Sequence, residues 1–361
     1  MNPTLQGFWI TFTRFIEVLS ISIPAFVLIG LVMWWFSEAR RKAPTLRSAV
    51  EMIFPRRVYT SPGFKVDLLH MLLSITFWLR FLGIVFALWA GMQIDKLLVA
   101  QFGPAMPWVQ SVWAVVLLQS VVVILARDFG FYLGHFVTHA VPFVWRVHRS
   151  HHSAEGMSVF TSYRLHPLDR AVVRVFHTSA AALATGAVLY ISGGKLAPGT
   201  MAVLGVWSTM ISIKTLFDHG NFWVSYGKLD WIVCSPAMHQ VHHSAQVRHW
   251  DKNMGEVFAI WDWMFGTIYV PSRQREVHQL GTRDSEIGTA NPHRTLWGFY
   301  WEPIRTMADM LRHPRLAYFS LQSTRHDEAT LAADSAQYPS AAGLLPLPVG
   351  PGASAGATLH R

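Results

Sequence analysis

Charged side chains are scarce in this chain. Of its 361 residues, 14% are charged and 52% are hydrophobic, whereas a typical soluble domain has about 25% charged residues. A disordered protein has the opposite balance, with few apolar residues and much charge, so general disorder is excluded. The chain has a single cysteine, Cys234, and this excludes a disulfide-stabilised scaffold, which needs cysteines in pairs.

The net charge of +9, with the eighteen histidines counted as neutral, rests on few residues. Nucleic-acid-binding domains are basic because lysine and arginine are abundant in them. This chain is instead dominated by apolar side chains, including 16 tryptophans and 23 phenylalanines, so we expect no nucleic-acid partner. The composition indicates an integral, multi-pass membrane protein, and the many histidines need an explanation of their own.

Long uncharged runs locate the expected membrane-spanning helices, each of which needs about 20 apolar residues. The second of these runs, residues 68–94, contains Arg80, and a charge is costly in mid-membrane. Either this run forms two shorter helices or Arg80 lies near an interface. The last two runs, 175–194 and 196–213, are separated by a glycine-rich turn and predict a helical hairpin. We expect an all-α polytopic bundle of about four to five transmembrane helices, formed by the runs 18–36, 68–94, 109–126, 175–194 and 196–213.

Basic residues set the expected orientation, because cytoplasmic loops of membrane proteins are enriched in lysine and arginine. The loop after the first run has seven of them between Arg40 and Lys65, whereas the next loop has Lys96 and the hairpin tip has Lys195. We therefore place the first loop, residues 127–170 and the chain after Lys214 in the cytoplasm. Binding of an acidic carrier or of anionic lipid headgroups is the other explanation for the basic loop.

Twelve of the eighteen histidines lie between His135 and His249, nearly all at or beyond the cytoplasmic ends of the expected spans. His135 and His139 are four residues apart and share one face of a helix. Two further clusters have the spacing i, i+3, i+4, which places three imidazoles on one helical turn. These clusters are His148, His151 and His152, and then His239, His242 and His243.

The clusters predict metal binding, since neutral imidazole is a good ligand for zinc, copper, iron and nickel. One structural zinc takes four ligands, so eight imidazoles suit two ions. A single His-x-x-x-His pair can arise by chance from surface histidines. A zinc or nickel site with a purely structural role is another alternative to a functional metal centre. Three histidine clusters in one hydrophobic chain favour the functional centre. Two irons side by side can reduce dioxygen and oxidise a C–H bond, and their position at membrane level favours a lipid substrate.

Four further residues are candidates for additional ligands or for groups that orient a ligand by hydrogen bonding. His166 and His219 flank membrane segments on the cytoplasmic side, and a purely structural role is equally open for both. His249 lies six residues after His243, and Asp128 lies seven residues before His135 on the same helix face. The acids near the clusters that can orient an imidazole are Asp128, Glu155, Asp169, Asp218, Asp230, Asp251 and Glu256.

The clusters and the residues that follow them resemble the fatty acid hydroxylase superfamily, which includes the sterol desaturase family. The resemblance extends from Asp128 to Pro271. Met254 departs from the aromatic residue that the family has between Asn253 and Gly255. The three residues between His135 and His139 favour the branch of sterol oxidases, alkylglycerol monooxygenases and bacterial polar-lipid hydroxylases. Beyond the clusters, the matching residues are Arg164-Leu-His166-Pro167, Ser244, Asn253, Gly255, Trp261-Asp262 and Phe265-Gly266-Thr267.

The resemblance implies a membrane-bound non-haem di-iron oxygenase, with the eight clustered histidines as ligands of two iron ions. Such an enzyme uses O2 and external electrons to hydroxylate or desaturate a sterol-like, fatty-acyl or polar membrane lipid. The chain has no His-Pro-Gly-Gly haem-binding segment, and one cysteine cannot hold an iron–sulfur cluster. The electron donor is therefore expected to be a separate carrier, such as a cytochrome b5-like protein or a ferredoxin. No catalytic side chain beyond the metal centre is assigned.

The alternative is a membrane metal-binding or metal-transport protein without oxygenase chemistry, which would place its ligands within the spans near the midplane. In either case we expect four segments: N-terminal transmembrane helices with the basic loop (1–126), a catalytic domain that includes the hairpin 172–217 (127–272), a C-terminal helical extension (273–321) and a disordered tail rich in Pro, Gly, Ala and Ser (322–361). The active site is expected on the cytoplasmic side of a bacterial inner membrane.

Overall fold

The computed structural model describes residues 20–21, 23–35, 45–73, 76–105, 111–282 and 291–312. Within these ranges the chain is helical, and its β-pairing is limited to two isolated bridges, so the expected all-α class is confirmed. The tail 322–361 and the Arg80 side chain lie outside the described parts. The longer helices are Ile23–Trp35, α2 (Leu46–Ile53), α4 (Pro62–Leu73), α5 (Thr76–Phe102), α6 (Val112–Ala140), α7 (Pro142–His152), α8 (Pro167–Ile191), α9 (Pro198–Asp218) and α13 (Leu296–Arg312).

Shorter helical segments connect these. They are α3 (Arg56–Tyr59), η1 (Val159–Tyr163), η2 (Gly227–Trp231), α10 (Pro236–His242), η3 (Val247–His249), α11 (Ile260–Phe265) and η4 (Pro292–Arg294).

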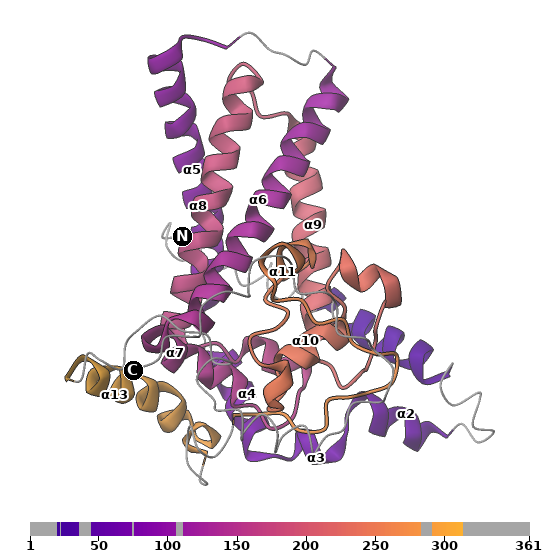
Figure 1. The fold of residues 1–361 in the computed structure, drawn as a ribbon. Helices are drawn as coiled ribbons and strands as arrows, with labels where there is room; N and C mark the ends of the chain where they lie inside the picture. Colours follow the sequence, from indigo (N-terminus) through magenta and orange to yellow (C-terminus); the bar gives the residue numbers. More distant parts are fainter. Residues whose placement is uncertain are drawn as a thin grey trace, which may run out of the picture.

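Four long helices, α5, α6, α8 and α9, run side by side and form the upper part of the molecule in Figure 1. Three of them, α6, α8 and α9, are long and apolar enough to cross a membrane. α8 and α9 form the expected hairpin, which turns at Gly193 and Gly194 with φ of 70° and 76°; glycine adopts this left-handed conformation without a Cβ penalty. The fold is thus a helical membrane bundle.

Two of the expected spans are only partly described. In the run 68–94 the structure describes α4 up to Leu73 and α5 from Thr76; the junction at 74–75 lies outside the described residues, so the choice between two shorter helices and a position of Arg80 near an interface stays open. In the run 18–36 residues 20–21 and 23–35 are helical, and the rest of the run lies outside the described residues. The total of four to five spans therefore stays a prediction, with three candidates among the described residues.

α6 and α8 approach closely because glycines of α6 face α8. A Cβ atom at Gly130 would lie 2.7 Å from the Cβ of Ala180, and one at Gly134 would lie 2.9 Å from the Cα of Val173. In lipid, where no hydrophobic driving force joins two helices, small residues allow backbones to pack this tightly. Since His135 follows Gly134, this contact fixes the rotation of α6 at the residue where the histidines begin.

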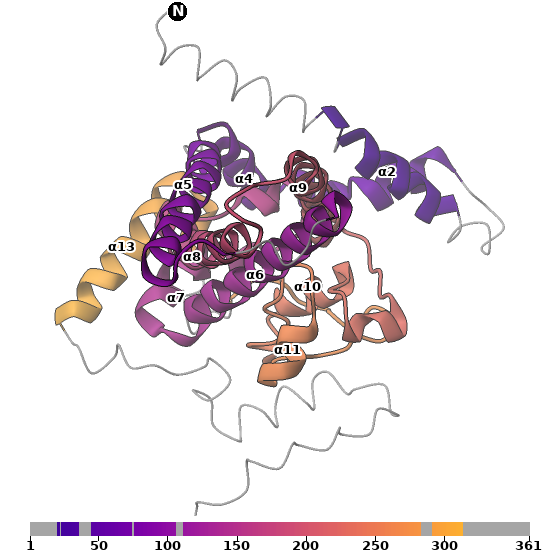
Figure 2. The same ribbon diagram turned by 90° about the horizontal axis from the view of Figure 1, so that it is seen from above.

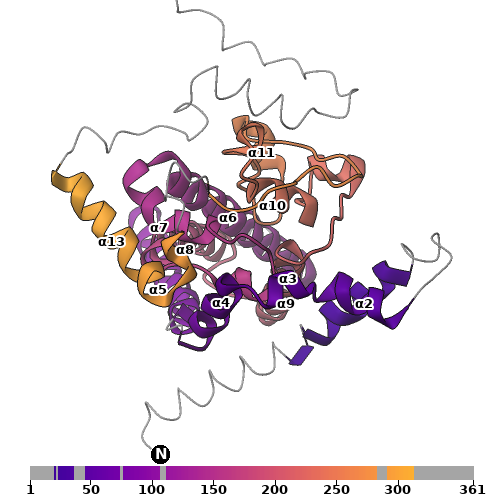
Figure 3. The same ribbon diagram turned by 90° about the horizontal axis from the view of Figure 1, so that it is seen from below.

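The shorter helices gather at one end of the bundle. Figure 2 shows α10 and α11 on one side of the long helices and α13 on the other, and Figure 3 shows α3 and α4 crossing the lower end. Proline at the first helical position starts α7 (Pro142) and α10 (Pro236), where its missing N–H costs no hydrogen bond. The ends of α6 and α9 therefore meet α7 and α10, and these four elements carry the clustered histidines.

Candidate metal centre

Nine imidazoles converge where α6, α7, α9 and α10 meet. They form two groups, and within each group the candidate ligand nitrogens lie within 4.8 Å of one another. The structure thus brings together all eight histidines singled out from the sequence and adds His219, which caps the end of α9. The first group is His135, His139, His148, His152 and His242, and the second group is His151, His219, His239 and His243.

Helical spacing divides each His-x-x-His-His cluster between the two groups. In α7, His148 and His152 are four residues apart and contribute to the first group, while His151 contributes to the second. In α10 the pair at i, i+4, His239 with His243, contributes to the second group instead. Two such helices facing each other therefore build two adjacent sites, and the ring centroids of His151 and His243 are 4.4 Å apart across the pair of helices.

Six of the nine rings are held through Nδ1. Those of His135, His151, His219 and His242 lie 2.8–3.0 Å from the main-chain oxygens of Met254, Arg164, Thr215 and Lys252. Those of His148 and His139 lie 3.0 and 3.3 Å from carboxylate oxygens of Asp169 and Asp251. A carbonyl or carboxylate oxygen only accepts hydrogen bonds, so Nδ1 carries the proton and Nε2 carries the lone pair in these rings.

The Nε2 atoms then point at one another. The distance between Nε2 of His135 and Nε2 of His148 is 3.2 Å, although both rings donate through Nδ1. In the second group Nε2 of His219 lies 3.5 Å from Nε2 of His151, and both of these rings also donate through Nδ1. Nε2 of the buried His242 has no hydrogen-bond partner. Lone pairs that converge without a shared proton repel each other, and a cation between them removes that repulsion. The arrangement therefore fits metal ions.

Burial lowers the pKa of six of these rings and keeps them neutral. Desolvation, followed by the neighbouring imidazoles, holds the pKa of His151, His152, His239, His242 and His243 well below the ordinary value. Burial also lowers the pKa of His219 to about 4. Neutral imidazole is the form that binds metal, so the centre is ready to bind ions at neutral pH.

These shifts predict how the metal-stripped protein responds to acid. In the unfolded chain the imidazoles protonate near pH 6.5, whereas in the folded protein they stay neutral to lower pH. The unfolded state then binds more protons, so stability is retained above about pH 6.5 and falls below it, by about 1.4 kcal/mol per pH unit for each such ring. We expect a steep fall in melting temperature between pH 7 and pH 5, measured by tryptophan fluorescence. A melting temperature of the stripped protein that stays level over this range would contradict the buried neutral cluster.

A short loop after α10 supports the first group through its main chain. The carboxylate of Asp262 accepts hydrogen bonds from the N–H groups of Met254 (2.7 Å) and Gly255 (2.9 Å) and from the hydroxyl of Thr267 (2.6 Å). The carbonyl of Met254 is thereby directed at His135. The side chain at position 254 takes no part in this contact, so methionine in place of an aromatic residue leaves it intact.

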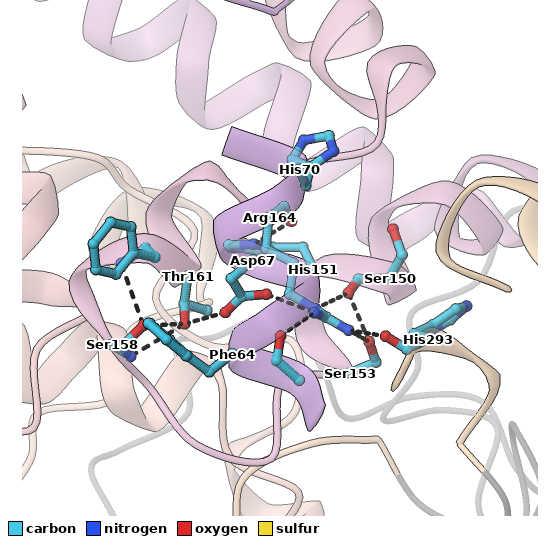
Figure 4. A network of polar contacts seen from close by, with 12 residues as sticks. Phe64, Asp67, His70, Ser150, His151, Ser153, Ser158, Thr161, Arg164 and His293 are labelled. Carbon is cyan, nitrogen blue, oxygen red and sulfur yellow. Dashed lines mark hydrogen bonds and ion pairs between the residues drawn. The ribbon is translucent and has the colours of Figure 1, made fainter. Parts of the chain in front are cut away.

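The second group is supported by Arg164, a fully buried residue (Figure 4). Its carbonyl accepts from Nδ1 of His151, and its guanidinium forms an ion pair of 2.6 Å with Asp67 of α4. The same guanidinium donates to the Ser150 and His293 carbonyls and to the Ser153 hydroxyl, at 2.7–3.0 Å. One residue thus connects His151 to α4, to α7 and to the segment before α13.

Three candidates from the sequence lie outside both groups. Asp128 accepts hydrogen bonds from the N–H groups of Val257 and Phe258 and from the indole of Trp261, and so fixes the segment before α11 to α6. His166 caps α8, with Nδ1 accepting from Leu168 and Nε2 near the carbonyl of Tyr300. The ring of His249 contacts Tyr269 and accepts from Arg248. Each has a structural role at its position.

The sequence analysis left a ligand role and a structural role equally open for His219. It did not single out Asp67 or the main-chain oxygens, and it named Arg164 only in the segment that resembles the family. The spacing of the second and third clusters gave no signal for these groups, because they come from distant parts of the chain. Asp169 and Asp251 were named among acids able to orient an imidazole, and the structure places both at Nδ1 of clustered histidines.

The bundle, with two neighbouring groups of buried imidazoles at the end of its spans, defines a class of membrane protein with a histidine-rich centre. Residues 120–267 match the family model described as fatty acid hydroxylase. All clustered histidines lie within this range, so the segment that holds them is similar to the fatty acid hydroxylase domain.

Curated relatives come from several branches. The chain is 27% identical over 190 residues to alkylglycerol monooxygenase of Xenopus tropicalis (49% of this chain, 37% of the relative). It is 30% identical over 156 residues to ornithine lipid hydroxylase OlsE of Rhizobium tropici (43% of each chain). It is 25% identical over 171 residues to putative Delta(7)-sterol-C5(6)-desaturase 2 of Arabidopsis thaliana (45% of this chain, 53% of the relative). The chain thus spans about two fifths of the length of the first two, and no solved structure matches it.

Proposed function

We propose that this protein is an integral membrane non-haem di-iron oxygenase that hydroxylates or desaturates a lipid C–H bond. The observation that carries the proposal is the pair of adjacent imidazole groups, in each of which two rings held through Nδ1 direct their Nε2 lone pairs at each other. His135, His139, His148, His152 and His242 would hold one iron, and His151, His219, His239 and His243 the other. When bound, the irons would supply the reduction of O2 and the oxidation of the C–H bond.

The chain's own residues hold and orient this centre. Asp169, Asp251 and the carbonyls of Met254, Lys252 and Arg164 fix the rings through Nδ1, as outer hydrogen-bond partners of metal ligands do. A small pocket lined by Trp145, Trp250 and three imidazoles of the first group adjoins the centre. We infer that this pocket admits O2 or water to that side of the metal centre.

The position of the centre supports a lipid substrate. The imidazoles lie at the ends of apolar helices long enough to span a bilayer, so a lipid reaches them without leaving the membrane. Alkylglycerol monooxygenase and ornithine lipid hydroxylase are named for lipids with polar headgroups, and we propose that a membrane lipid of this kind is the substrate, ahead of a sterol-like or fatty-acyl one. The basic first loop favours a cytoplasmic active site, and a bacterial inner membrane is the proposed location.

The electrons would come from a separate carrier, such as a cytochrome b5-like protein or a ferredoxin. A metal transporter is the competing function, but it would hold its ions near the midplane of the bilayer. Here α7 and α10, which supply six of the nine imidazoles, lie outside the candidate spans. The arrangement therefore favours an oxygenase over transport.

Metal analysis and lipidomics test the proposal together. We expect iron-replete protein, purified without oxygen, to contain two irons per chain, one for each imidazole group. Membrane lipids of cells that express it should include species heavier by one oxygen or lighter by two hydrogens, and these species should be missing with a His148→Ala variant. Protein without iron, or an unchanged lipid profile in cells with a loaded centre, would count against a di-iron lipid oxygenase.

A further inference from the structure

Two short segments outside the candidate spans expose large apolar side chains. In and after η2, Leu229 is 60% exposed and Ile232 is 52% exposed; at the end of α11, Trp263, Met264 and Phe265 are 62%, 60% and 52% exposed. We name these five residues the apolar shelf. Exposed contiguous apolar surface on a protein marks an interaction site.

The two halves of the shelf form one structural unit. The N–H of Ala259, which precedes α11, donates to the carbonyl of Ile232 (2.9 Å), and Val233 pairs with Phe258 in an isolated β-bridge. Both acids of these segments are turned inward: Asp230 and Asp262 are fully buried and hydrogen-bonded. Of the charged residues within η2 and α11, Lys228 is the exposed one. The shelf thus presents apolar and aromatic side chains with a basic residue beside them.

The shelf is continuous with a membrane-spanning helix. The ring of Phe265 stacks on Tyr132 and Phe129 of α6, with centroid distances of 5.4 and 6.2 Å. Phe129 lies 129 − 112 = 17 residues after the start of α6 at Val112, or about 26 Å along a helix that rises 1.5 Å per residue. A hydrocarbon core is about 30 Å thick, so α11 lies where the core meets the headgroups. Figure 1 shows α11 beside the lower part of α6.

We propose that the apolar shelf is immersed in the bilayer, at the boundary between acyl chains and headgroups of the leaflet nearest the histidines. Tryptophan, phenylalanine, methionine and leucine gain free energy by leaving water there, and Lys228 is placed to meet anionic headgroups. Nine to eleven residues before the exposed end of α11, the loop held by Asp262 directs the Met254 carbonyl to His135. His135 lies 135 − 129 = 6 residues further along α6 than Phe129, or about 9 Å, so immersion of the shelf holds the histidine centre just beyond the headgroup boundary of this leaflet.

Nitroxide probes in lipid nanodiscs that hold one copy of the full chain test this depth. In a Cys234→Ala background, single cysteines are introduced at Met264 and Leu229 on the shelf. The lipid reference is Leu117, 65% exposed on α6, and the water reference is Asp309, whose side chain is 55% exposed on α13. All four positions are on the surface, so labelling leaves the packed interior unchanged. Collision rates with oxygen and with a water-soluble nickel chelate are then compared.

We expect the probes at 264 and 229 to collide several-fold less with the nickel chelate, and more with oxygen, than the probe at 309, approaching the values at 117. Nickel accessibility like that of 309 at either shelf position would overturn the proposal, because the surface would then face water. Shielding from both agents that appears only when a nanodisc holds two copies would also overturn it, since a second chain would then cover the shelf. None of these readouts depends on oxygenase activity.

Discussion

Replacing His151 by alanine is expected to abolish lipid oxidation and to remove metal from the second imidazole group, while the fold persists. His151 is buried, contacts the rings of His243 and His219, and is held through Nδ1 by a single hydrogen bond to Arg164. Loss of an outer hydrogen-bond partner of a metal ligand already costs about 10–100-fold in affinity or activity. Loss of the ligand itself should therefore leave below about one hundredth of the wild-type turnover.

Metal content by elemental analysis and the elution profile on size exclusion separate a lost site from a lost fold. The expected result is about half of the wild-type metal content, in monodisperse protein with unchanged helical circular dichroism. His278→Ala is the matched control, because His278 is exposed and lies outside both groups; it should keep the metal and the activity. Full metal content and full turnover in His151→Ala would show that this ring is no ligand.

The helical bundle and the histidines could be predicted because their signals are local. Uncharged runs mark the helices, and spacing of three and four residues marks the faces of α7 and α10 on which the imidazoles lie. The same helical geometry divides each cluster between the two groups. Which group a given imidazole joins is decided by how α7 and α10 face each other. That facing depends on tertiary packing, because α7 packs on α6, α6 on α9 and α9 on α10, and no residue spacing encodes these contacts.

The groups that orient the imidazoles were harder to predict for a different reason. Four of the six Nδ1 partners are main-chain oxygens, and every residue type carries one. The loop conformation that directs the Met254 carbonyl at His135 depends on Asp262. The position of Arg164, whose carbonyl accepts from His151, depends on Asp67 of a separate helix. Likewise the expected span 68–94 was apolar by composition, although α4, which contains its first residues, buries the polar side chain of His70 in the protein. The hydrophobicity of a run does not show whether its side chains face lipid or the interior of the protein.

Asp67→Asn is expected to be among the most destabilising single changes in the chain. Asp67 and Arg164 are both almost fully buried and form an ion pair of 2.6 Å, and Thr161 donates to the second carboxylate oxygen at 2.9 Å. Removing one partner of a buried pair leaves an uncompensated charge and costs about 3–5 kcal/mol. The exposed pair of Asp309 with Arg312 provides the control, because Asp309→Asn should cost less than about 1 kcal/mol. Melting followed by tryptophan fluorescence in detergent gives both values.

The same change should reach the metal centre, because Arg164 offers its carbonyl to His151 while Asp67 holds its guanidinium. We expect Asp67→Asn protein to lose about 10–100-fold in metal affinity, with the loss confined to the second group. In an Asp67→Asn, Arg164→Met double variant no buried charge is left. The losses of unfolding free energy in the two single variants should therefore add up to more than the loss in the double variant, with a coupling of about 0.5–3 kcal/mol. A coupling near zero, or wild-type metal affinity in Asp67→Asn, would mean that the ion pair does not position His151. Since Asp67 lies outside the residues 120–267 that match the family model, a positive result would make α4 part of the metal-binding unit.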